Sequence, residues 1–216
     1  MGGGVGRVMR ILVLGASGGT GQQVVEQALN HGLEVVAFVR DAGRLPFTHE
    51  RLTVIAGDVT DAVAVQTAVA GCDAVISTLG SRGQRPVTVY SDGIANTIRA
   101  MTARGICRLV VVSAAGAGAD SPDVPLRVQV MRRMPGLRPV YEDMERMEGD
   151  VMLSDLDWTI VRSAALRDGP LTGIYRVVEG NAVPKGTHIS RADLAALLLK
   201  CAQGDLYLKK AVAVAY

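Results

Sequence analysis

Residues 11–21 read ILVLGASGGTG, and a helical pattern follows from Gln22. A short apolar strand, a glycine-rich turn and a helix in this order predict the phosphate cradle of a nucleotide-binding α/β fold. The N–H groups and the positive dipole end of the helix would face the anion. We therefore assign a dinucleotide-binding role to Gly15, Ala16, Ser17, Gly18, Gly19, Thr20 and Gly21. The alternative is a glycine-rich turn that serves only to pack the strand against the helix.

The composition favours one α/β domain with an aliphatic core. The chain has 216 residues, of which 49% are hydrophobic and 4% aromatic. Val, Ala, Leu and Ile must therefore form the core, as they do in parallel sheets covered on both faces. The net charge of +2 gives no electrostatic case for binding nucleic acid or an anionic membrane surface.

Cysteines, histidines and the N-terminus bear on metal binding and location. The three cysteines and three histidines are scattered without metal-ligand spacing, so no metal site is expected. An unpaired set of this kind is typical of free thiols in a reducing compartment. Residues 1–9 lack the apolar core of a signal peptide, and no run reaches transmembrane length. We expect a cytoplasmic protein.

Apolar runs and helical patterns alternate along the chain. Strands are expected at 10–14, 34–39, 52–55, 74–79, 109–113 and 157–162, with a further strand at 174–178. Helices are expected at 20–31, 61–70, 87–104, 141–153 and 191–202. This alternation predicts a Rossmann-like, doubly wound parallel sheet. We expect a flexible lead-in at 1–9 and one domain at 10–216, with a small C-terminal region on the substrate side.

Two segments do not fit the alternation. Residues 114–140 are irregular, and long irregular stretches after strands are where substrates bind in this architecture. They contain a cluster of arginines at positions 127, 132, 133 and 138, which is either a solvated face or a site for an anionic substrate. Residues 211–215 form a short apolar tail that we expect to pack within the chain.

Basic residues after the second strand predict which dinucleotide is bound. Arg40 ends that strand, where an acidic residue would hydrogen-bond the ribose 2′-hydroxyl of NAD. A cation suits the 2′-phosphate of NADP instead, and Arg44 follows one helical turn later. The alternative is that Arg40 only pairs with Asp41 or Asp58. We favour NADP as the cofactor.

Residues after the third and fourth strands complete the predicted cofactor site. Asp58 and Val59 lie where a carboxylate accepts from the adenine amino group. Asp58 would otherwise be the N-cap of the next helix, but Thr60 or Asp61 could supply that cap. The fourth strand ends in a segment expected beside the cofactor ribose, or in a plain turn. Its residues are Leu79, Gly80, Ser81 and Arg82.

Two serines stand at the predicted nicotinamide end. Ser113 ends the fifth strand and is the candidate catalytic residue, and Ser163 ends the sixth. Such a serine usually acts with Tyr-x-x-x-Lys, in which the lysine lowers the tyrosine pKa. Here Tyr141 is followed at that spacing by Glu145, and no lysine occurs between 114 and 184. Ordinary alcohol–ketone chemistry is therefore not expected.

These motifs resemble a known family. GASGGTG at 15–21, VRDAGRLP at 39–46, the segment 57–83, DGPLTGIY at 168–175 and ISRADLAALLLKCA at 189–202 are similar to the NmrA-like, NAD(P)H-binding group of atypical short-chain dehydrogenases. Within that group the chain is most similar to the biliverdin-IXβ reductases, also called flavin reductases (NADPH).

The resemblance implies direct hydride transfer from NADPH to a planar conjugated acceptor, with the proton taken from solvent. The chain departs from these relatives on the nicotinamide side. Ala114 replaces a second serine, Ala164 follows Ser163 where relatives have proline, and Glu148 replaces a histidine. We therefore do not transfer the tetrapyrrole substrate. Two alternatives remain open, a dinucleotide-sensing regulator of the NmrA type and a biosynthetic reductase, epimerase or isomerase.

Overall fold

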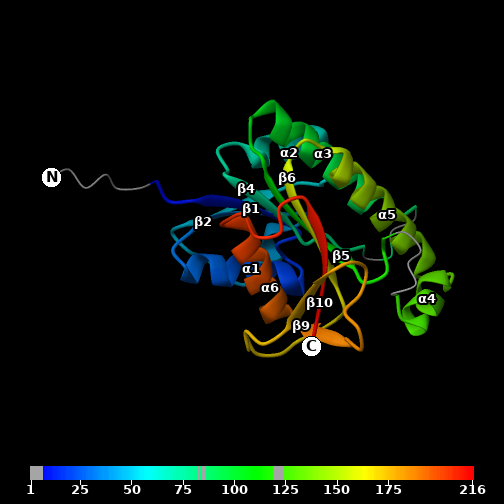
Figure 1. The fold of residues 1–216 in the computed structure, drawn as a ribbon. Coiled ribbons are helices and arrows are strands. Elements are labelled where there is room, and N and C mark those ends of the chain that lie inside the picture. The colour runs from blue at the N-terminus through cyan, green and yellow to red at the C-terminus, as the bar shows by residue number, and fades with distance from the viewer. Residues whose placement is uncertain (1–6, 82, 84–85, 119–123) are drawn as a thin grey trace.

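One eight-stranded sheet forms the centre of the computed structural model, which describes residues 7–81, 83, 86–118 and 124–216 (Figure 1). The strand order is β3-β2-β1-β4-β5-β6-β10-β8. The strands are β1 (Arg10–Leu14), β2 (Glu34–Val39), β3 (Leu52–Ala56), β4 (Ala74–Ser77), β5 (Arg108–Ala114), β6 (Asp157–Ser163), β8 (Arg176–Glu179) and β10 (Lys210–Ala215). All neighbours run parallel except β8, which is antiparallel to β10. The predicted Rossmann-like, doubly wound fold is confirmed.

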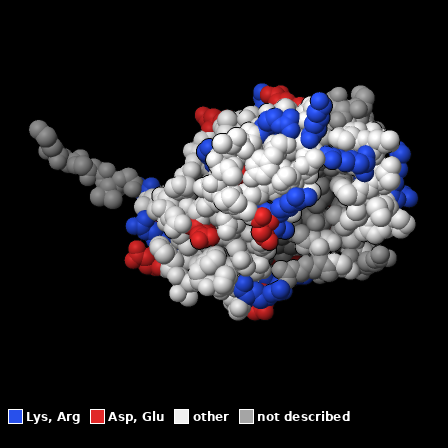
Figure 2. Space-filling model, turned by 90° about the horizontal axis from the view of Figure 1, so that it is seen from below, with Lys and Arg blue, Asp and Glu red and all other residues white. Residues whose placement is uncertain are grey.

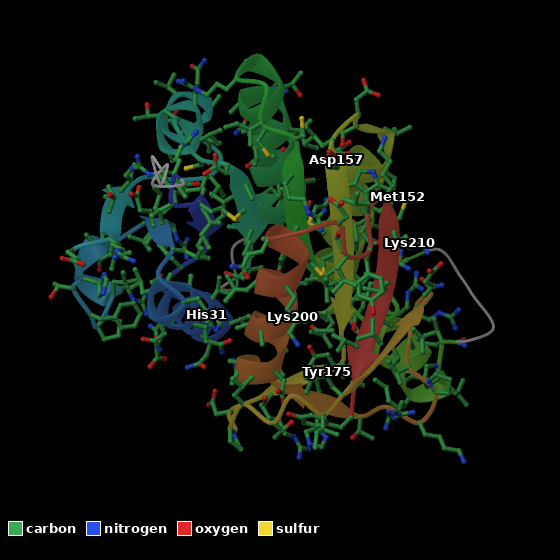
Figure 3. The ribbon with its side chains drawn as sticks, turned by 60° about the vertical axis from the view of Figure 1, so that its left-hand side comes forward. His31, Met152, Asp157, Tyr175, Lys200 and Lys210 are labelled. Carbon is green, nitrogen blue, oxygen red and sulfur yellow. The ribbon has the colours of Figure 1, made fainter. Side chains whose placement is uncertain are left out.

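Helices cover both faces of the sheet. One face carries α1 (Gly19–Asn30) and α6 (Arg191–Ala202), which lie side by side in Figure 3. The other carries α2 (Ala62–Val69), α3 (Val89–Ala103) and α5 (Arg138–Leu153). A short helix, α4 (Leu126–Arg133), lies beyond the sheet at the end of α5, and a 3₁₀ turn, η1 (Ala42–Arg44), follows β2.

The central strand β1 shows why its sequence is apolar at every position. Ile11 and Val13 pack against α1 and α6, whereas Leu12 and Leu14 pack against the opposite helices. All four side chains are fully buried. A parallel strand with helices on both faces has no solvated side, so its residues do not alternate between apolar and polar.

The second half of the chain packs its apolar tail within the fold, as expected, and adds elements that the sequence did not predict. The apolar tail is the strand β10, which lies parallel to β6 and buries Val212 and Val214. Two three-residue strands, β7 (Ala165–Arg167) and β9 (His188–Ser190), pair in a small separate sheet. The irregular segment after β5 contains α4, which buries no residue. The strands β10 and β7 pair with strands that are distant in sequence, and the periodicity of a short segment does not indicate such pairing.

A buried carboxylate holds this region together. Asp193 is fully buried and accepts hydrogen bonds from Tyr216 Oη at 2.5 Å, Thr172 Oγ1 at 2.7 Å and Gly173 N–H at 2.7 Å. Burial alone would raise its pKa, but the bonds from Tyr216, Thr172 and Gly173 outweigh it and lower the pKa. The network joins α6, the loop after β7 and the last strand.

Candidate functional site

Two positions of the glycine turn, Gly15 and Gly21, have no room for a side chain. Gly15 has φ of +74°, and a Cβ there would lie 2.6 Å from the Thr78 carbonyl oxygen. A Cβ on Gly21 would lie 2.3 Å from the Gly15 carbonyl oxygen. Both positions therefore require glycine, the first for its backbone conformation and the second for the close packing of α1 on the turn.

The start of α1 leaves amide groups without acceptors. The Gln22 N–H donates to the Gly18 carbonyl at 2.8 Å. Within the described chain, the N–H groups of Gly19, Thr20 and Gly21 have no acceptor, and Gly18 provides no side-chain cap. The first turn contains no acidic residue. A helix start of this kind binds an anion through its N–H groups and its dipole.

A cleft of about 450 Å³ extends from this turn along the carboxyl ends of the first four strands. Its lining includes nine of the predicted residues, Gly15, Ser17, Gly18, Arg40, Asp58, Val59, Leu79, Gly80 and Ser81. Figure 2 views the molecule from below and shows a hollow in that face, with basic and acidic side chains dispersed around it.

Several predicted residues lie elsewhere. Ala16, Thr20 and Gly21 are buried and support the turn instead of lining the cleft. Gly19 faces α6 and Arg44 is exposed in η1, and neither lines the cleft. Arg44 does not line the cleft because the chain leaves β2 in a 3₁₀ turn and does not continue as a helix. Arg82 lies outside the described residues.

Arg40 and Asp58 face the cleft without pairing directly. Arg40 is exposed and forms no ion pair with any residue in the described part of the chain. Asp58 accepts from Thr60 N–H at 2.9 Å and Thr60 Oγ1 at 2.8 Å. These bonds, with a smaller effect of the Arg40 charge, lower the pKa of Asp58. Asp61, not Asp58, is the N-cap of α2.

A second cavity of about 570 Å³ adjoins the cleft, because Leu79 and Gly80 line both. It lies between the carboxyl ends of β5, β6 and β10 and the helices α4 and α5. Its walls are mostly aliphatic and include Val112, Val128, Met131, Met144, Leu166, Val183 and Val214. Val128 and Met131 belong to the segment that the sequence placed on the substrate side, but the other residues were not predicted, since only the folded chain brings them to one place.

Ser113 and Ser163 both line this second cavity. Ser113 is only 1% exposed, and its Oγ has no hydrogen-bond partner among the described residues. Ser163 Oγ donates to the Ser113 carbonyl oxygen at 3.3 Å. A buried hydroxyl without a partner is costly to the folded protein and therefore indicates a place for a ligand atom.

Two tyrosines also line this cavity, and neither is poised to release a proton. Burial raises the pKa of Tyr90 and the pKa of Tyr141, although Arg132 partly opposes the effect at Tyr141. Tyr90 instead accepts the Ser81 N–H at 2.9 Å. Its own backbone N–H donates to the buried Asp143 at 2.9 Å.

Glu148 is in a buried ion pair and lines neither cavity. Its carboxylate accepts from Arg162 at 2.6 Å, and Arg162 also donates to the Gly180 carbonyl oxygen at 3.1 Å. The pair joins α5 to β6 and to the end of β8. Glu148 stands where relatives have a histidine, and Arg162 neutralises its buried negative charge. The sequence alone did not indicate this pairing.

The other charged clusters are occupied by internal contacts. Arg132 pairs with Glu145 at 2.6 Å and Arg138 with Glu142 at 2.7 Å, whereas Arg127 lines the second cavity and donates to the Gly186 carbonyl oxygen. A larger cavity of about 680 Å³ lies at the amino edge of the sheet. Its Arg108 donates to backbone oxygens of three segments and to Thr159, so the charge of Arg108 is used within the fold.

Two further kinds of site are absent from the residues that the structure describes. No cluster of three or more His, Cys, Asp or Glu there could hold a metal ion. No helix there is both long and apolar enough to cross a membrane.

Comparisons with known proteins agree with this geometry. The family model described as NAD(P)H-binding matches residues 15–205. The chain is 30% identical to the photosystem II assembly factor Ycf39 of Synechocystis sp., over 78% of this chain and 48% of that protein. It is 32% identical to the 3-diazoavenalumate denitrifying reductase of Streptomyces sp., over 78% of this chain and 59% of that protein. It thus spans about half the length of these curated relatives.

A solved structure is also similar over almost its whole length. ChuY, an anaerobillin reductase from Escherichia coli O157:H7, has a TM-score of 0.79 at 25% identity, covering 96% of this chain and 97% of that one. The resemblance found in the motifs is therefore confirmed. The chain belongs to the NAD(P)H-binding family and has a Rossmann-like fold.

Proposed function

We propose that the protein uses NADPH to reduce a planar conjugated acceptor, such as a flavin, a quinone or a tetrapyrrole-like molecule. The observation that carries this proposal is the junction of two cavities at Leu79 and Gly80. One is a polar cleft that begins at the phosphate turn. The other is an aliphatic cavity with the unpartnered hydroxyl of Ser113. An elongated cofactor and a flat apolar molecule would meet at the junction.

The residues present fit a dinucleotide with a 2′-phosphate. The open amides at the start of α1 suit the pyrophosphate, and a Cβ at Gly15 or Gly21 would destroy the turn that presents them. Arg40 lines the cleft, where it is exposed and has no ion pair in the described chain. A guanidinium can bind a phosphate through two parallel hydrogen bonds. We therefore favour NADP over NAD.

In this proposal the chain assists the reaction by positioning the acceptor and excluding water, and less by acid–base catalysis. The bound cofactor would supply a hydride from its nicotinamide ring. Ser113 would donate a hydrogen bond to an oxygen at the junction, and the aliphatic walls would keep water from the reacting face. Because the pKa values of Tyr90 and Tyr141 are raised, neither suits general acid catalysis at neutral pH.

That arrangement selects the class of acceptor. A conjugated acceptor delocalises the electron pair of the hydride, so its proton can arrive from solvent. An aliphatic ketone would need a well-placed acid at the moment of hydride transfer. Planar conjugated molecules therefore suit this site better than aliphatic ketones.

The test is oxidation of NADPH in the presence of FMN, a quinone or a linear tetrapyrrole. We expect turnover with at least one of them, and Arg40→Ala should weaken NADPH binding by about tenfold or more. Arg104→Ala is the matched control, because Arg104 is exposed at the opposite edge of the sheet. No turnover across a broad panel of planar acceptors would overturn the proposal.

A non-catalytic regulator is the second candidate. Two observations support it. The cavity that contains Ser113 has no tyrosine suited to donate a proton, and the chain is similar to a protein named as an assembly factor. A regulator would bind NADP tightly, prefer one redox form and turn over no acceptor. Titration with NADP and NADPH, followed by the same acceptor panel, separates the two functions.

A further inference from the structure

Arg191 packs directly over the phosphate turn, although it comes from a distant part of the chain. It is the first residue of α6. A Cβ on Gly19 would lie 2.8 Å from Arg191 Cδ and Nε and 3.6 Å from its guanidinium carbon. A side chain at position 19 would therefore require the Arg191 side chain to move. Arg191 was not among the residues that the motifs predicted.

The placement of this cation is unfavourable for α6 itself. The N-terminus of a helix carries the positive end of the dipole, so a cation in the first turn is repelled. The partner of Arg191 is Asp168, at 2.7 Å, but the Asp168 side chain is 94% exposed. An ion pair with one side so exposed contributes little to stability. Neither the helix nor the pair explains why an arginine stands here.

An anion at the neighbouring turn would explain it. The N–H groups of Gly19, Thr20 and Gly21 are open within the described chain, and the guanidinium lies beside the first of them. We propose that Arg191 binds the pyrophosphate of the dinucleotide, and that Asp168 holds the guanidinium until the phosphate replaces it. This rests on dinucleotide binding by the family and not on the identity of the acceptor.

Arg191 and Arg40 should differ in what they recognise. The pyrophosphate is common to NADPH and NADH, whereas only NADPH carries the 2′-phosphate assigned to Arg40. Loss of the Arg191 charge should therefore weaken both dinucleotides by a similar factor. Loss of the Arg40 charge should weaken NADPH selectively. The dissociation constants of NADPH and NADH therefore distinguish the role of Arg191 from that of Arg40.

The experiment measures dissociation constants of NADPH and NADH by fluorescence titration, without any acceptor. The variants are Arg191→Met, which keeps an apolar side chain to pack on Gly19 while removing the charge, and Asp168→Ala. We expect Arg191→Met to weaken both dinucleotides by about tenfold, the loss typical of a charge-assisted hydrogen bond. Asp168→Ala should strengthen both by about threefold, because it removes the competing anion.

The opposite signs distinguish binding from a structural role. If the pair only held the fold, both variants would weaken binding or leave it unchanged, and that result would overturn the proposal. Because Asp168 is exposed, its variant tests the idea even where Arg191→Met folds poorly. Lys200→Ala is the matched control, since it removes a positive charge from the last turn of the same helix (Figure 3). It should leave both dissociation constants unchanged.

An unchanged Arg191→Met variant beside a weakened Arg40→Ala variant would reject the role of Arg191 and keep the NADP assignment. Weakening of NADPH alone by Arg191→Met would also reject it, because that pattern belongs to the 2′-phosphate. Failure of the acceptor panel would leave these binding results intact.

Discussion

The hydroxyl of Tyr90 accepts the Ser81 N–H at 2.9 Å, and this bond joins the two cavities. The ring of Tyr90 lines the aliphatic cavity, while Ser81 lines the cofactor cleft. Asp143 anchors the other side of the residue by accepting the Tyr90 N–H at 2.9 Å. The position of the loop after β4 is thus tied to the residues that shape the acceptor side.

Removing the Tyr90 hydroxyl should loosen that loop without emptying the cavity. In Tyr90→Phe the ring remains and the Ser81 N–H loses its acceptor, so we expect a loss of about 1 kcal/mol of unfolding free energy. NADPH should bind more weakly, because the loop lines its cleft. Tyr175→Phe is the control, since no hydrogen bond to the Tyr175 hydroxyl is found among the described residues. Equal affinities in Tyr90→Phe and the parent would contradict this role.

Ser113→Ala should separate stability from activity. The hydroxyl is buried and without a partner in the described chain, so its removal should leave the unfolding free energy unchanged or raise it by up to about 1 kcal/mol. The rate of acceptor reduction should fall by about tenfold, because a ligand oxygen loses its donor. Denaturant titration and steady-state kinetics check both parts. A variant that is less stable but equally active would show that the hydroxyl serves only packing.

The buried ion pair should be much more sensitive to loss of one partner than of both. Glu148→Gln leaves the Arg162 charge without its carboxylate, and we expect a loss of about 3–5 kcal/mol. The double variant Glu148→Met with Arg162→Met should lose less, because no charge is left buried. Unfolding in urea measures both. Similar losses for the single and double variants would contradict this account.

Asp193 should make the free energy of unfolding depend on pH in the acidic range. Its pKa is lowered in the folded chain from an ordinary value of 3.8, so the unfolded chain binds a proton more readily. The stabilisation is therefore full above that value and is lost as pH falls through the lower folded pKa. Unfolding from about pH 6 to about pH 2 should show this loss, and Asp193→Asn should flatten it.

Tyr216→Phe tests the same network from the other side. It removes the 2.5 Å hydrogen bond to Asp193 while keeping the ring beside His188. We expect a loss of about 1–3 kcal/mol of unfolding free energy at neutral pH, because the bond is to a charged group. A smaller loss at low pH would follow, since the carboxylate is then protonated. Thermal unfolding at two pH values provides the measurement.

Local sequence alone determined the phosphate turn, the alternation of strands and helices and the basic end of β2. Each depends on residues close in sequence, such as the glycines between β1 and α1, whose steric demands are the same in any surroundings. The fold class followed, because alternating elements with short connections allow few topologies.

Only the tertiary structure decided the rest. The C-terminal tail became a strand because β6 provided a partner, and Arg191 reached Gly19 because α1 and α6 cover the same face of the sheet. The aliphatic cavity, the buried hydroxyl of Ser113 and the pairing of Glu148 with Arg162 likewise join distant segments. Contacts of this kind depend on how whole elements pack, and no short window of sequence records them.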